Sequence, residues 1–383
     1  MEEKRVTWAE LYFDLVFVFA VTQVSALLHH RHGWAELARA AVVFVPVYWC
    51  WVGTTVQANV RQVDNTRDRL GIFAVGLGGL FMALAVPGAD GPRGVLLGAA
   101  YWYARLVLLL LITTGPQRTR KAWIGPYGVG AFVSGPLLLA GGLLDGGLLD
   151  GWARTALWTV AALCDLSAPV VFRRRLAKVT YHPAHLPERF GCFLLIALGE
   201  SIVGIGAPVA AAEHLTAAEL VSVATAFVIT CELWWLYFNY AADAMRYAVA
   251  TSASRRDVIR RVFSYGHFAL IAGVIAVAVG FGETVADPGE SLAAGPLGLL
   301  YGGCVLYLTA FSYTRWMMFR MVSPTRLVAA GVVIGLVPAM VRLPALGALV
   351  VLAVVLGVLN LVEYRRVSRA RHLDEAAEAT ELL

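Results

Sequence analysis

The chain has 383 residues, of which 59% are hydrophobic and only 15% are charged, and its mean hydropathy is +0.69. These values exclude an ordinary soluble domain and are typical of a protein with many membrane-spanning helices. The net charge of +5 is interpreted as a record of membrane orientation, and no nucleic-acid partner is expected.

Runs of about 20 apolar residues predict the spanning helices, because the hydrocarbon core of a bilayer requires about that length of helix. In chain order the predicted spans are residues 10–28, 35–53, 70–87, 94–113, 122–144, 153–172, 190–211, 217–240, 263–282, 296–313, 326–342 and 345–362. The sequence therefore predicts an all-α polytopic membrane protein with about twelve transmembrane helices.

Basic residues give this arrangement an orientation. Groups of Lys and Arg occur at residues 4–5, 61–69, 118–121, 173–189, 246–261, 315–326 and 365–371. All of them fall on the same side of a twelve-span chain, and the intervening loops carry few basic residues. Because short cytoplasmic loops are enriched in Lys and Arg, both termini are predicted to be cytoplasmic.

The first predicted span carries two carboxylates, Glu10 and Asp14. Residues four apart lie on one helix face, so these two acids share a side. An ionisable group at membrane depth is costly, and it normally faces a protein interior, a cavity or a ligand. The alternative is that Glu10 lies at the level of the lipid head groups and that only Asp14 is immersed.

Further ionisable residues are predicted to lie inside the membrane. Glu200 is expected near the midplane of the seventh span, next to Gly199 and Ser201, and His267 begins the ninth span. Arg105 lies in the middle of the fourth span and is the expected counter-ion of Asp14, Glu200 or Glu232. Intramembrane charges are functional candidates, although a purely structural buried ion pair would have the same composition.

Several segments together resemble the bacterial low temperature requirement protein A (LtrA) family. They are ELYFDLVFVFAVTQ (10–23), WVGTTVQAN (51–59), ERFGCFLLIALGES (188–201), LWWLYFN (233–239) and YGHFALIAG (265–273). The chain departs from the family at residues 63–68, which read VDNTRD where the family usually has an Asp-rich stretch. The resemblance implies a bacterial inner-membrane location, and it implies little about chemistry because the family name describes a growth phenotype.

The two halves of the chain also resemble each other. Glu10 and Glu188 open corresponding spans, and the Gly-x-Phe pattern of residues 70–73 recurs at 265–268. This similarity predicts two parallel six-helix repeats, residues 1–178 and 179–366, followed by a charged cytoplasmic tail at 367–383. Such repeats typically place a binding site at their shared interface.

Two polar stretches follow the second span and the eighth span. The candidate metal ligands are Asp64, Asp68, Asn239 and Asp243, and the candidate phosphate-binding residues are Arg61, Arg67 and Arg246. Within each stretch the ligands are four residues apart, so their oxygens face one direction in a helix. Such oxygens suit Mg²⁺, which proteins hold with one or two carboxylates plus substrate phosphates, and Arg binds phosphate bidentately. The pattern is similar to the Asp-rich pairs of membrane prenyltransferases and the acidic and Asn-containing motifs of class I terpene cyclases. A solvated ion-pair loop is the alternative.

Two functions follow from these candidates. The first is a membrane enzyme acting on an isoprenoid diphosphate, as a terpene cyclase or prenyltransferase, with Mg²⁺ and diphosphate at the cytoplasmic face. Trp234 and Trp235 would then contact substrate, and Asp14 or Glu200 would supply a proton if protonation starts the reaction. The second is a proton-coupled transporter using the intramembrane carboxylates. A sensor or structural protein is a third alternative, and the sequence leaves homo-oligomer formation open.

Overall fold

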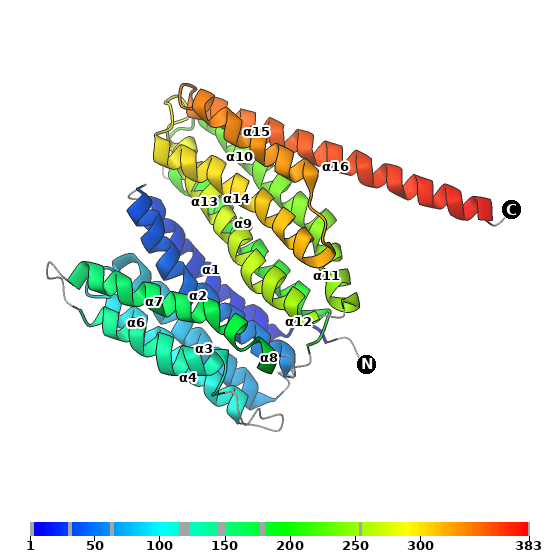
Figure 1. Cartoon of the computed structure of the whole chain (residues 1–383). Helices are drawn as coiled ribbons and strands as arrows, with labels where there is room; N and C mark the ends of the chain where they lie inside the picture. The colour runs from blue at the N-terminus through cyan, green and yellow to red at the C-terminus, as the bar shows by residue number, and fades with distance from the viewer. Residues whose placement is uncertain are drawn as a thin grey trace. The chain divides into compact units, whose positions relative to one another are not determined.

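The computed structural model describes residues 4–29, 33–61, 65–114, 123–144, 150–176, 181–210, 212–252 and 255–381. Its α-helices, all but α5 labelled in Figure 1, are α1 (Trp8–His29), α2 (Trp34–Val60), α3 (Thr66–Ala85), α4 (Gly94–Thr113), α5 (Pro126–Val129), α6 (Gly135–Gly142), α7 (Asp150–Val171), α8 (Arg173–Leu176), α9 (His185–Ala210), α10 (Ala217–Trp235), α11 (Ala242–Thr251), α12 (Arg255–Val258), α13 (His267–Ala286), α14 (Ala294–Phe319), α15 (Pro324–Met340) and α16 (Ala345–Glu381). A short 3-10 helix, η1 (Val86–Gly88), and three π-helical segments, η2 (Gly130–Ser134), η3 (Leu236–Ala241) and η4 (Ile259–Gly266), complete the helical elements.

The all-α polytopic membrane architecture is confirmed. In the described ranges, 9 helical segments are long and apolar enough to cross a membrane: Trp8–Leu28, Trp34–Val60, Thr66–Gly88, Gly94–Thr113, His185–Ala210, Ala217–Thr251, Arg256–Ala286, Ala294–Phe319 and Ala345–Arg369. The other three predicted spans are also helical. However, α15 has only 17 residues, α7 contains Arg154 and Asp165, and the fifth span is divided into α5, η2 and α6. The total of twelve crossings stays a prediction.

Side chains at the helix ends account for several helix starts. Thr7 and Glu10 form reciprocal hydrogen bonds at the start of α1, and Thr216 and Glu219 form the same capping box at the start of α10. Such pairs satisfy backbone N–H groups that have no partner within the helix. At α3 the Asn65 side chain accepts a hydrogen bond from the Asp68 backbone.

The chain packs as two compact units. Unit 1 comprises residues 1–200 and 246–268, and unit 2 comprises residues 201–245 and 269–383. This division describes packing, whereas the two predicted six-helix halves describe repetition in the sequence, which stays a prediction.

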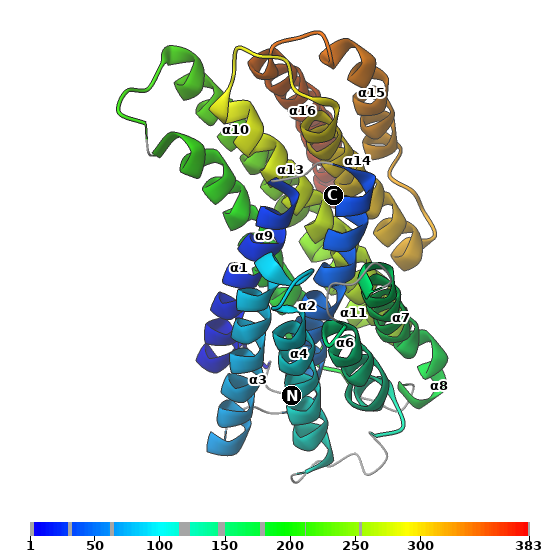
Figure 2. The same cartoon turned by 90° about the vertical axis from the view of Figure 1, so that its left-hand side faces the viewer.

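Within unit 1, α1 packs on α2 and α3, α3 packs on α4, and α7 packs on α2 and α6. Figure 2 shows α3 and α4 side by side. Gly130 of η2 permits a close approach to α4, because a Cβ atom at this position would overlap the Arg105 guanidinium. The first turns of α9 complete the core around α1 and α2.

Within unit 2, α10 packs on α16, α14 packs on α15, and α15 packs on α16. Gly273 of α13 and Gly303 of α14 lie against each other's backbone, since a Cβ on Gly273 would be 2.8 Å from the Gly303 carbonyl oxygen. Small residues at such crossings let membrane helices approach closely.

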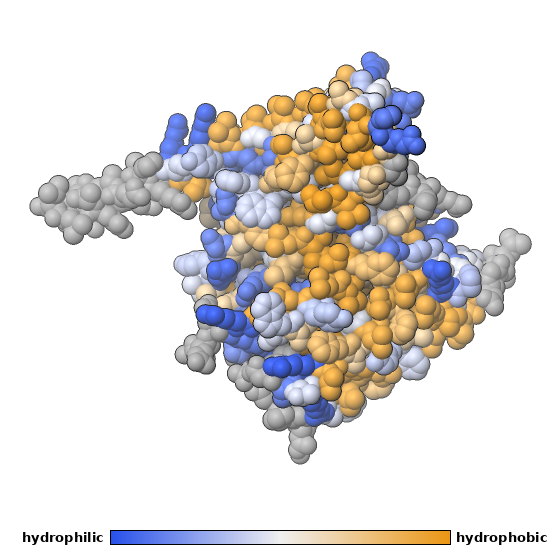
Figure 3. Space-filling view, turned by 180° about the vertical axis from the view of Figure 1, so that it is seen from behind, coloured by the Kyte–Doolittle hydropathy of each residue, from blue (hydrophilic) through white to orange (hydrophobic). Residues whose placement is uncertain are grey.

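Large apolar side chains remain on the outside of the helices. Leu110, Phe132 and Val328 are among the many that are exposed, and Figure 3 shows apolar residues over much of the face that it views. A surface of this kind suits lipid, which identifies a bilayer as the environment of the chain.

Candidate functional site

Three helices of unit 1 bring polar side chains together in its interior. The seven residues are Glu10 and Asp14 of α1, Trp51, Thr55 and Asn59 of α2, and His185 and Arg189 of α9. On each helix they follow one another at intervals of four residues, so each helix presents one polar face. Each is at most 4% exposed. We call these seven residues the acid cluster.

Asp14 is the most strongly bound member of the acid cluster. Its Oδ2 lies 2.5 Å from Nη1 of Arg189, and its Oδ1 accepts a hydrogen bond of 2.8 Å from the Trp51 indole. The same Arg189 nitrogen donates to the Glu10 carbonyl oxygen at 3.0 Å, and the guanidinium lies over the Trp51 ring. Arg189 therefore ties α9 to both acids of α1.

Glu10 has one oxygen on its own helix and one on α9. Oε2 accepts hydrogen bonds from the backbone and hydroxyl of Thr7, both at 2.9 Å. Oε1 lies 3.0 Å from Nε2 of His185 and 3.9 Å from Nε of Arg189. Glu10 is also buried inside the protein, and its depth in the bilayer stays a prediction.

Asn59 determines which nitrogen of His185 carries a proton. The Asn59 amide is held by two bonds to the His182 backbone, one donated to its carbonyl at 2.9 Å and one accepted from its N–H at 3.1 Å. The second amide hydrogen of Asn59 then faces Nδ1 of His185, 3.4 Å away. Nδ1 is therefore the acceptor, and the neutral ring carries its proton on Nε2, which faces Glu10.

The ionic groups of the acid cluster are two carboxylates and one guanidinium, with Nε2 of His185 3.0 Å from Glu10. The two carboxylates and the guanidinium together carry one net negative charge, and a neutral His185 ring leaves this charge uncompensated. A buried ion pair is tolerated when its charges compensate each other, and an uncompensated charge is costly.

The other predicted proton-transfer residues lie elsewhere in unit 1. Glu200 is eleven residues beyond Arg189, about 16 Å along an α-helix, and accepts a hydrogen bond of 2.5 Å from Thr22. His267 is fully buried, lies 3.1 Å from the Val262 carbonyl through Nδ1, and stacks on Phe263.

The prediction that Arg105 is the counter-ion of Asp14, Glu200 or Glu232 was wrong. Its acidic partner is Asp165 of α7, 3.7 Å away, and Arg189 takes the place beside Asp14. Asp165 also accepts hydrogen bonds from Tyr101 and Ser134. Arg105 and Asp165 thus form a charge-balanced pair, as a purely structural buried ion pair would.

Of the first group of candidate metal and phosphate residues, Arg61, Arg67 and Asp68 lie close together. Asp64 lies outside the described residues. Asp68 accepts from the Asn65 amide at 2.9 Å and pairs with Arg61 at 3.5 Å. Arg61 donates to the carbonyls of residues 111 and 114, and Arg67 donates to the hydroxyl of Thr114.

The second group of these candidates lies where the chain passes from unit 2 to unit 1. Unit 2 contains Trp234, Trp235, Asn239 and Asp243, and Arg246 is the first residue that returns to unit 1. All five side chains are exposed. Across the described ranges, no three His, Cys, Asp or Glu side chains are grouped so that they could hold a metal ion. Mg²⁺ binding therefore stays a prediction.

Asp14 also borders a groove on the surface of unit 1. The groove lies between α1 and α9, has a volume of about 490 Å³, and is lined by apolar side chains including Leu11, Leu15, Leu195 and Ile196. This volume falls within the 300–1,000 Å³ range of small-molecule sites. Asp14 is the acidic residue of its lining.

Sequence reasoning found the acids of the cluster but missed His185, Arg189 and Asn59 as their partners. The signal was present: Asn59 and Arg189 fall within segments that carry the family resemblance, and His185 and Arg189 are four residues apart. Their pairing with α1 spans 175 residues of sequence, and spacing alone does not reveal it.

Comparison with known proteins gives the chain a family. The profile of the "Bacterial low temperature requirement A protein (LtrA)" family matches residues 5–361. A Rhizobium meliloti protein described as uncharacterized is 27% identical over 333 residues, which cover 82% of this chain and 78% of the relative. No solved structure matches. The family profile spans almost the whole sequence, and the chain belongs to the bacterial LtrA family of multi-pass membrane proteins.

Proposed function

We propose that the protein is a proton-coupled secondary transporter of a small molecule in which the acid cluster binds the coupling proton. The observation that carries this proposal is the unbalanced charge of the cluster: Glu10, Asp14 and Arg189 together carry one negative charge in a buried position. One bound proton makes the cluster neutral. Two interacting carboxylates share such a proton, so it belongs to the cluster and not to one residue.

Binding of this proton would change how α9 is held. In the unprotonated cluster Arg189 is attracted to Asp14 at 2.5 Å and to Glu10 at 3.9 Å. A proton on either carboxylate removes one of these attractions, and it favours a state in which α9 moves relative to α1. A ligand shifts a conformational equilibrium by its differential affinity for the two states, which is the coupling that a proton-driven carrier requires.

The basic residues orient this mechanism in the membrane. Their distribution supports cytoplasmic termini, and it places Glu10, in the first turn of α1, toward the cytoplasmic side. Glu200 lies farther along α9 and contacts Thr22, so it is suited to accept the proton deeper in the bilayer.

The transport proposal is tested in membrane vesicles that contain the full chain and a pH-sensitive dye. A panel of organic anions, amines and sugars is added, and collapse of an imposed pH gradient is recorded. We expect at least one compound to move protons with the wild-type protein and not with Asp14→Asn. The Glu363→Gln variant removes a carboxylate from a balanced pair and serves as the matched control.

A second candidate is an enzyme that acts on an isoprenoid, and the apolar groove beside Asp14 favours it. A groove of about 490 Å³ lined by Leu11, Leu15 and Ile196 would accept part of an isoprenoid chain, with a carboxyl group at hand for protonation. Because Asp68 already binds Asn65 and Arg61, the reaction in this candidate starts by protonation.

The two candidates give opposite results in one further experiment. Vesicles with the protein are incubated with prenyl diphosphates of several lengths, with and without Mg²⁺, and extracted for hydrocarbon products. Products that depend on Asp14 would establish the enzyme. No products, together with substrate-dependent proton movement, would establish the transporter.

A further inference from the structure

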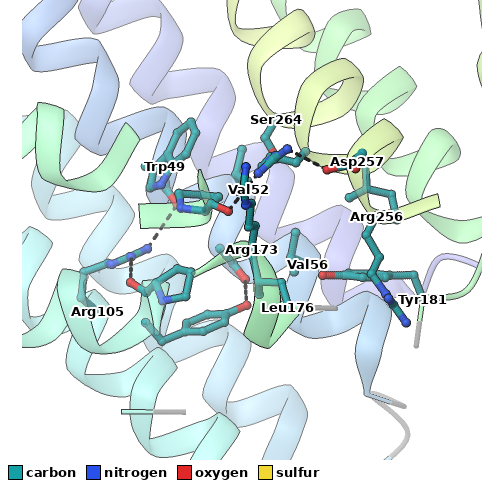
Figure 4. Close-up of a pocket in the computed structure, with 16 residues that line it drawn as sticks. Trp49, Val52, Val56, Arg105, Arg173, Leu176, Tyr181, Arg256, Asp257 and Ser264 are labelled. Carbon is teal, nitrogen blue, oxygen red and sulfur yellow. Dashed lines mark hydrogen bonds and ion pairs between the residues drawn. The ribbon is translucent and has the colours of Figure 1, made fainter. Parts of the chain in front are cut away.

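A second polar pocket in unit 1 is separate from the acid cluster. It lies among α2, α4, α5, α8, α12 and η4 and holds about 90 Å³. Figure 4 shows Arg105, Arg173 and Arg256 around it, with Trp49 on one wall and Tyr181 next to Arg256. A fourth arginine, Arg260, also lines the pocket.

Two of these arginines are neutralised and two are not. Arg105 pairs with Asp165 at 3.7 Å, and Arg260 pairs with Asp257 at 2.7 Å. Arg173 and Arg256 have no carboxylate partner among the residues that the structure describes, and both are exposed. The pocket therefore carries about two uncompensated positive charges.

Some of the residues that line the pocket are buried, and their positions are fixed by hydrogen bonds. Arg105 is buried and held by the carbonyls of Trp49 and Pro126 at 3.4 and 3.1 Å. Tyr181 is also buried, and burial raises the pKa of its phenol to about 12. The Tyr181 hydroxyl consequently keeps its proton at neutral pH, and it is available as a hydrogen-bond donor beside Arg256.

The size of the pocket limits what it can hold. One water needs about 10–15 Å³ of such cavity volume, so a pocket of about 90 Å³ admits a small anion. Guanidinium groups bind phosphate oxygens in pairs of parallel hydrogen bonds. The charge near +2 and the phenol donor both suit a phosphate group.

We propose that this pocket, formed by Arg173, Arg256 and Tyr181, binds a phosphate monoester or inorganic phosphate dianion. Two sources have this chemistry, a free phosphate compound and the head group of a phosphatidic acid. The proposal does not depend on whether the acid cluster serves transport or catalysis, because it concerns binding at a different place in unit 1.

The test uses the purified full chain in detergent micelles and measures binding by calorimetry. One arm titrates inorganic phosphate, and the other titrates short-chain phosphatidic acid against phosphatidylcholine of the same chain length. Each arm compares the wild type with Arg173→Gln, Arg256→Gln, Tyr181→Phe and Arg174→Gln. The last variant is the matched control, since Arg174 is exposed on the same helix and does not line the pocket.

We expect about tenfold weaker binding for each arginine variant, which corresponds to the loss of one charge-assisted contact. The control should bind like the wild type, and Tyr181→Phe should lose a few fold. Binding of phosphate identifies a free compound as the source, and binding of phosphatidic acid alone identifies a lipid head group. Absence of binding in both arms, or equal affinities in Arg173→Gln, Arg256→Gln and the control, would overturn the proposal.

Discussion

Two buried arginines, one in each compact unit, differ in how their charge is balanced. In unit 2, Arg326 makes two parallel contacts with Glu363, 2.9 Å from Nε to Oε1 and 2.7 Å from Nη2 to Oε2. It also donates to the Leu236 carbonyl at 3.2 Å and lies over the Phe311 ring. One cation meets one anion, and the remaining donors are directed to neutral groups.

In unit 1, Arg189 faces two carboxylates. Its contacts with Asp14 and Glu10 leave one negative charge over, and Nδ1 of the neighbouring His185 faces the Asn59 amide. The comparison teaches that burial and close contact alone do not mark a functional ion pair. We propose that a cluster that needs one more proton for neutrality is functional, and the following substitutions test that difference.

The largest effect is expected for Arg189→Met. This change leaves Glu10 and Asp14 buried without a cation, and losing one partner of a buried pair costs about 3–5 kcal/mol. Because the two adjacent carboxylates also repel each other, we expect the loss of stability to lie near the upper end of this range. Thermal unfolding in detergent should show it, with Arg174→Met as the exposed control. Equal melting temperatures of the two variants would contradict the burial of an acid cluster.

A smaller loss is expected for Glu363→Gln. The substitution leaves Arg326 buried with a neutral partner, at a cost of about 3 kcal/mol. Because this pair is balanced, proton movement in vesicles should stay at the wild-type level. A variant that is stable but inactive in proton movement would show that the Arg326–Glu363 pair is functional.

Asp14→Asn gives the clearest comparison between the acid cluster and the Arg326–Glu363 pair. Like Glu363→Gln, it removes one carboxylate from beside a buried arginine. Here the change leaves Glu10 and Arg189 as a balanced pair, and Asn retains an acceptor for Trp51. We expect a loss of only about 1 kcal/mol, together with complete loss of proton coupling. Destabilisation as large as that of Glu363→Gln would mean that the cluster carries no excess charge.

The smallest effect is expected for His185→Gln. A Gln amide can lie beside Glu10, where Nε2 of His185 lies 3.0 Å from Oε1, so the stability should fall by about 0.5 kcal/mol. Proton coupling should persist, because the exchangeable proton is assigned to the two carboxylates. Activity that disappears at unchanged melting temperature would instead assign that proton to His185.

Much of the fold could be predicted from the sequence because apolar runs reveal spanning helices directly. The helices α1 to α4, α9, α10, α13 and α14 coincide with predicted spans, whereas α11 and α12 lie between the eighth and ninth predicted spans. The fifth predicted span is divided by η2, whose π-helical turns leave no mark in an apolar run. The helix α16 continues to Glu381 beyond its predicted end at 362, since its polar continuation favours helix without favouring membrane.

The acids of the site were visible in the sequence and their partners were not. Glu10 and Asp14 stand out because carboxylates are rare in an apolar run, whereas Trp51 and Arg189 reach Asp14 across 37 and 175 residues. Arg105 was assigned a partner by its depth alone, and only the ion pair between α4 and α7 shows that Asp165 is its partner. The charge balance of a buried cluster can be judged only when the contacts between its residues are known.

The most direct test of the account is the infrared difference spectrum of the protein between high and low pH, recorded at the carboxylic acid C=O band. The account predicts a band for one protonated carboxyl group in the wild type, its loss in Asp14→Asn, and its persistence in Glu363→Gln. A band that survives in Asp14→Asn, or one that disappears only in Glu363→Gln, would contradict the claim that the acid cluster binds the exchangeable proton.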